Sequence, residues 1–149
     1  DAMPDNIYGW LAFTVTAYNV NHMVDFMKWK LTESGFQRIN STNRRPIITH
    51  HVAHHPKHLN IRVLPNDAKK RLTKKFQSFV NWTEQNGFDI HTIKQAKNIS
   101  DGVCKYMNSE SYYDSHWDEF INYTRALDKI RKENLLDVEP AFKDYINEF

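Results

Sequence analysis

Cysteine is almost absent from this chain of 149 residues, and its single cysteine, Cys104, has no partner for an internal disulfide. The chain is therefore not a disulfide-stapled secreted scaffold, and we expect a reducing, cytoplasmic location. One thiol also cannot hold an iron–sulfur cluster, because such clusters are bound by about four cysteine thiolates. We expect Cys104 to be a small buried apolar side chain.

Glycine and proline are scarce as well, with four and five residues in the whole chain. The scarcity leaves no Gly-rich or Pro-rich linker, so we expect a single domain over residues 1–149. Its strand-containing half covers about residues 10–65 and its helical half about residues 66–149. The net charge of +2 predicts no nucleic-acid partner. No apolar run reaches the roughly 20 residues that span a bilayer, which predicts no membrane segment.

The first half of the chain contains the strand signals. Trp10–Tyr18 is β-branched and aromatic, which is typical of a buried strand, and Asn19 or Asn21 can cap a following helix that ends near Ser34. Two further β-prone runs follow, at Ile47–Val52 and Leu59–Leu64. The order strand, helix, strand predicts a βαβ unit with parallel strands.

The second half reads as helices, separated by turn signals. Apolar residues at helical spacing predict helices over about residues 66–86, 89–108 and 115–132, and a short terminal helix over 141–149. Gly87 is placed to end the first of these, and Ser115 with Asp118 resembles a capping box that opens the third. The fold class is therefore α/β and helix-rich, with a partial parallel sheet followed by three to four helices.

The segment Pro46–Pro65, PIITHHVAHHPKHLNIRVLP, holds five of the eight histidines. Ligands of α/β sheets gather outside the carboxyl ends of strands, where residues 51–55 are expected to lie. The predicted pocket residues are Asn19, His50, His51, His54 and His55. The alternative is that these histidines are ordinary exposed or hydrogen-bonded side chains.

A metal site is a further alternative, because imidazole binds several transition metals. The candidates for metal ligands are His51, His54, His55 and His58. Residues four apart in an extended strand are separated by roughly 13 Å, and adjacent side chains point to opposite faces. Pro56 also prevents a continuous helix through this stretch, so the spacing disfavours a shared ion.

Asp128 and Arg131 are three residues apart on a predicted helix, beside apolar neighbours. A structural ion pair is the expected role for such a pair, ahead of a catalytic one.

Two strings carry a family resemblance: TAYNVNHMVDFMKW, and THHVAHHPKHLNIRVLPNDAKKRL. Together they resemble the back half of radical S-adenosylmethionine proteins of the twitch/SPASM-related group, in which a strand ending in Tyr-Asn leads into a helix. A later strand in that group is followed by a Pro, a short apolar run, and "LP" before a Lys-containing helix. The matching elements here are Tyr18-Asn19, Pro56, Leu59–Val63, Leu64-Pro65 and Lys69.

The tail FINYTRALDKIRKENLLDVEPAF is similar to the closing pattern of the same group. Asp128 and Arg131 match its "DxxR" element, whereas Glu139-Pro140 departs from the Pro-Glu order. The resemblance covers roughly residues 12–146. The CxxxCxxC motif that holds the [4Fe–4S] cluster of the family is missing.

The resemblance implies that the chain is the C-terminal, substrate-side part, or a degenerate relative, of a radical S-adenosylmethionine enzyme. A full-length member would use S-adenosylmethionine and a [4Fe–4S] cluster, but we expect no cofactor on this chain alone and no independent catalysis. Its first residue, Asp1 rather than Met, favours a missing N-terminal segment. The alternative is a small non-enzymatic α/β module that binds a protein partner or a metal ion through its histidines. Open strand edges also predict a homo-oligomer, since unpaired backbone groups recruit other chains.

Overall fold

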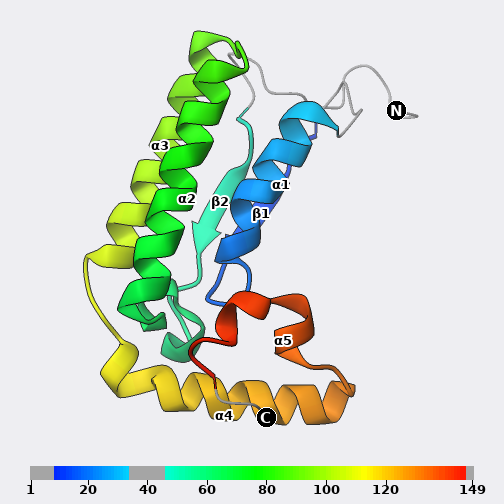
Figure 1. Cartoon of the computed structure of the whole chain (residues 1–149), viewed down its shortest axis with the longest axis vertical. Coiled ribbons are helices and arrows are strands. Elements are labelled where there is room, and N and C mark those ends of the chain that lie inside the picture. Colours follow the sequence, from blue (N-terminus) through cyan, green and yellow to red (C-terminus); the bar gives the residue numbers. More distant parts are fainter. Residues whose placement is uncertain (1–8, 34–45, 147–149) are drawn as a thin grey trace.

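The computed structural model describes residues 9–33 and 46–146, which form a helix-rich α/β fold (Figure 1). The strands are β1 (Ala12–Val15) and β2 (Thr49–Val52). The helices are α1 (Val20–Thr32), α2 (Asn66–Gln85), α3 (Ile90–Asn108), α4 (Tyr113–Arg131) and α5 (Leu135–Val138). The predicted fold class is confirmed. No described helix combines the length and the apolar character needed to cross a membrane.

The βαβ unit is present, because β1 and β2 pair in parallel with α1 between them in the chain. The register runs from Ala12 opposite Thr49 to Val15 opposite Val52. The first strand is shorter than the predicted Trp10–Tyr18, since the carbonyl of Thr16 accepts hydrogen bonds that begin α1. The predicted end of this helix near Ser34 lies outside the described residues.

The prediction of a strand at Leu59–Leu64 is wrong. This run forms two 3₁₀ turns, η2 (Lys57–Leu59) and η3 (Ile61–Val63). Ile61, Val63 and Leu64 are buried, but the backbone of this run bonds locally: the N–H of Val63 donates to the carbonyl of Asn60. A short apolar run indicates that the segment is buried, but it does not specify a strand. Where no neighbouring strand pairs with the segment, its backbone can form 3₁₀ turns instead.

Helix boundaries follow local signals in most places. α2 begins after Pro65 and ends before Gly87, whose φ of +70° is a left-handed conformation that favours glycine. Asp89 caps α3 through its side chain. The predicted capping box at Ser115 is wrong, because α4 begins two residues earlier, at Tyr113.

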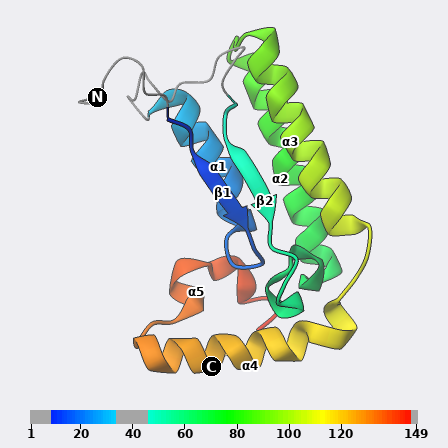
Figure 2. The ribbon, with the colours of Figure 1, turned by 180° about the vertical axis from the view of Figure 1, so that it is seen from behind.

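One hydrophobic core joins these elements. In Figures 1 and 2, α2 and α3 lie side by side, and α4 runs across one end of the other helices. The largest fully buried apolar side chains include Met23, Met27, Ile47, Ile61, Leu64, Phe76, Phe79, Met107 and Phe120.

The two-stranded sheet is covered on one face only by the described helices. Figure 2 shows the strands from the uncovered side. Phe13 points to the covered face, where its ring centroid lies 5.4 Å from that of Phe26 on α1. Ala12, Thr14 and His51 alternate with the covered residues and are exposed.

Candidate functional site

The histidines on β2 do not converge. Successive strand residues point to opposite faces, so half-buried His50 lies on the helix side and exposed His51 on the open side. Burial lowers the pKa of His50, and the neighbouring His51 lowers it further. The neutral imidazole is therefore the favoured form of His50 in the fold.

The histidines after β2 also go to separate surroundings. His54 Nδ1 lies 2.9 Å from the hydroxyl of Tyr106, and His55 is exposed. His58 is only 7% exposed and its Nδ1 lies 2.9 Å from Glu119 Oε1 on α4. Within residues 9–33 and 46–146, no three or more His, Cys, Asp or Glu side chains gather as metal ligands.

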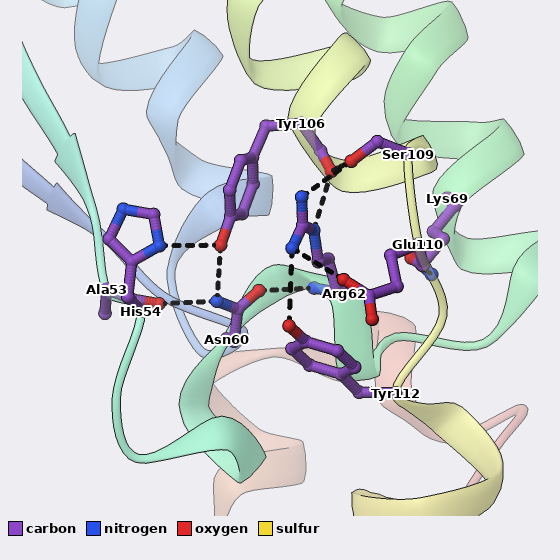
Figure 3. A network of polar contacts seen from close by, with 9 residues as sticks. All are labelled: Ala53, His54, Asn60, Arg62, Lys69, Tyr106, Ser109, Glu110 and Tyr112. Carbon is purple, nitrogen blue, oxygen red and sulfur yellow. Dashed lines mark hydrogen bonds and ion pairs between the residues drawn. The ribbon is translucent and has the colours of Figure 1, made fainter.

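His54 belongs instead to a network of polar contacts at the carboxyl end of β2 (Figure 3). Asn60 is its buried centre, at 1% exposure. The Asn60 amide donates to the carbonyl of Ala53 at 2.9 Å and to the Tyr106 hydroxyl at 2.7 Å, and its oxygen accepts from the N–H of Arg62. The Tyr106 hydroxyl thus joins Asn60 to His54 Nδ1, and the tautomer of His54 sets which atom of the second contact donates.

Arg62 forms the other half of the network. Its Nε donates to the carbonyl of Tyr106, and its terminal nitrogens donate to Ser109, Glu110 and Tyr112 (Figure 3). The guanidinium carbon lies 3.9 Å from the centroid of the Tyr106 ring. Every nitrogen of this side chain donates at least one hydrogen bond, so the network fastens η3 to the end of α3.

Asn19 has a role that sequence reasoning missed. Its side-chain oxygen accepts from the N–H of Thr16 at 2.8 Å, and its amide donates to the carbonyl of Thr14 at 2.9 Å. The carbonyls of Leu11 and Val15 bond to β2, so the alternate residues Thr14 and Thr16 direct their backbone groups away from it. Asn19 therefore occupies the positions that a further strand would use on the carboxyl half of the β1 edge.

Asn19 also lines a groove together with Asp128 and Arg131. The structure thus brings the predicted pocket residue Asn19 to this pair, while His50, His51, His54 and His55 do not line the groove. The groove lies past the carboxyl end of β1, between the start of α1 and the ends of α4 and α5.

The expected ion pair between Asp128 and Arg131 is not formed. Asp128 Oδ2 accepts a hydrogen bond from the N–H of Leu135 at 2.9 Å. Arg131 is the last residue of α4 and is exposed, because Lys132 takes a left-handed φ of 56° and turns the chain. The aspartate therefore fastens α5 to α4 instead of pairing with the arginine.

No family model matches this chain, and no curated protein or solved structure matches it either. The relationship to radical S-adenosylmethionine proteins, which rests on short strings of sequence, stays a prediction.

Proposed function

We propose that this chain is a non-enzymatic α/β module that assembles with a second copy of itself through the uncovered face and outer edge of β1. One observation carries the proposal: the described helices cover a single face of a parallel sheet (Figure 2). Parallel sheets are normally covered on both faces, and an isolated pair of strands is marginally stable. A second chain would supply the missing cover.

The exposed surface is compatible with its own copy. Residues Trp10–Tyr18 include no charged side chain, so two such edges meet about a twofold axis without repulsion. Trp10, two residues before β1, is 66% exposed, and a large aromatic side chain of that kind is a common anchor of protein interfaces.

Asn19 limits where the second copy can pair. Its amide already bonds the outward groups of Thr14 and Thr16, whereas none of the described residues bonds the outward backbone groups of Ala12 on the amino half of the edge. The contact is therefore centred on residues 10–14, and the open sheet face extends it.

A binding role is also favoured by the state of the polar groups. The candidate histidines lie in separate surroundings, and the side chains of the Figure 3 network are hydrogen-bonded to one another. The Nδ1 atoms of His54 and His58 therefore have partners within the fold.

The test is the mass of the full chain in solution, measured by light scattering at high micromolar concentration. We expect a dimer for the wild type and a monomer for Thr14→Lys, which places a charge on the exposed face. Ser78→Lys, an exposed position on α2, is the matched control and should remain dimeric. Phe13 is unsuitable for this test because it packs on α1. A wild-type monomer, or equal dissociation in both lysine variants, would overturn the proposal.

A further inference from the structure

The groove at the carboxyl end of β1 has a volume of about 340 Å³. That value is near the lower end of the ~300–1,000 Å³ of small-molecule sites, so it suits a small ligand. Sites of α/β proteins are commonly found at this end of the strands. Apolar side chains from α4 and α5 form much of its wall, including Leu127, Leu135 and Val138.

The groove has one group that can bind an anion. The guanidinium of Arg131 is exposed and makes no hydrogen bond or ion pair with the described residues. A guanidinium of this kind is well suited to bind a carboxylate through two parallel hydrogen bonds.

A further polar group of the groove is His22 on α1, whose side chain is 46% exposed. Its Nε2 lies 3.1 Å from Oε2 of Glu139, and Glu139 is only 3% exposed. Both oxygens of that carboxylate also accept from the amide of Asn21, at 3.0 and 2.9 Å. The buried Glu139 therefore fixes the imidazole by one nitrogen and leaves Nδ1 as its remaining polar atom.

The acidic residues of the groove limit the charge of the ligand. Asp128 and Glu133 line the groove together with Arg131. Two neighbouring carboxylates disfavour a ligand with more than one negative charge, such as a phosphate dianion. Among anions, a single carboxylate bound directly to the guanidinium meets the least repulsion.

We propose that this groove binds a small amphipathic monocarboxylate, with its carboxylate on Arg131 and its apolar chain along Leu127, Leu135 and Val138. The residues that would hold this ligand are not those of the β1 surface proposed for self-association. The ligand class combines the two features of the groove, an apolar wall and one unpaired cation.

Isothermal titration calorimetry on the full chain tests the proposal, with octanoate as the probe. We expect octanoate to bind the wild type and to bind Arg131→Gln at least about tenfold more weakly, since the charge-assisted bonds are lost. Lys129→Gln removes an exposed cation of the same helix that does not line the groove, and it should bind like the wild type.

Two further probes separate the contributions of charge and chain. Octanol has the same tail without the charge, and octylamine has the opposite charge, so both should bind more weakly than octanoate. Val138 is an exposed part of the wall, so Val138→Ser should weaken octanoate binding while the fold is retained. Absence of octanoate binding, stronger binding of octylamine, or equal losses in Arg131→Gln and Lys129→Gln would overturn the proposal.

Discussion

Replacing Asn60 by alanine is expected to destabilise the fold by removing the centre of the Figure 3 network. The substitution deletes the hydrogen bonds to the Ala53 carbonyl, the Tyr106 hydroxyl and the Arg62 N–H. A buried polar group that loses its partner costs ~1–3 kcal/mol, and Tyr106 keeps its contact with His54. We therefore expect a loss of roughly 3 kcal/mol in the free energy of unfolding. At ~2–4 °C per kcal/mol for a chain of this size, Tm should fall by about 6–12 °C.

Circular dichroism at 222 nm during heating measures Tm, and urea titration supplies the free energy of unfolding independently. The matched control is Asn98→Ala, an exposed asparagine on α3, which should change stability by less than about 0.5 kcal/mol. If Asn60→Ala were no more destabilising than this control, the network would not stabilise the η2–η3 segment as its hydrogen bonds indicate.

The other predictions concern a helix cap, a histidine and the end of α4. Asp89→Ala should cost about 1 kcal/mol, because its carboxylate accepts from two backbone N–H groups in the first turn of α3. Its hydrogen bonds to Thr92 lower its pKa, so this stabilisation is lost as pH falls through the folded-state pKa, and the wild-type and variant Tm values should then converge. Burial lowers the pKa of His50, so the wild type should lose stability as pH falls below 6.5, the ordinary pKa of histidine. His50→Gln should flatten that decline in Tm. Parallel pH profiles of Tm for the wild type and the variant would contradict this assignment. Asp128→Ala should lower the free energy of unfolding by about 1 kcal/mol, because it loses the hydrogen bond from the N–H of Leu135. Arg131→Ala should leave Tm unchanged. Equal decreases in Tm for the two variants would instead indicate that Asp128 and Arg131 form an ion pair in solution.

The sequence by itself determined the features that depend on neighbours along the chain. The stop at Gly87 and the start of α3 at Asp89 could be predicted because caps act over three or four residues. The parallel βαβ unit followed from the order of strand and helix signals, since short connections allow few arrangements.

Tertiary contacts decided everything that joins distant parts of the chain. Whether Ile61–Val63 forms a strand or a turn depends on a neighbouring strand, which local propensity does not specify. The His54–Tyr106 contact joins residues 52 apart, and no spacing rule reaches that far. Asn19 was a predicted pocket residue and does line a groove, but its bonds to the β1 edge come from the way the chain folds back after the strand. The role of the Asn19 side chain depends on which backbone groups of β1 are left without a partner by β2. Those groups are defined only after the two strands have paired.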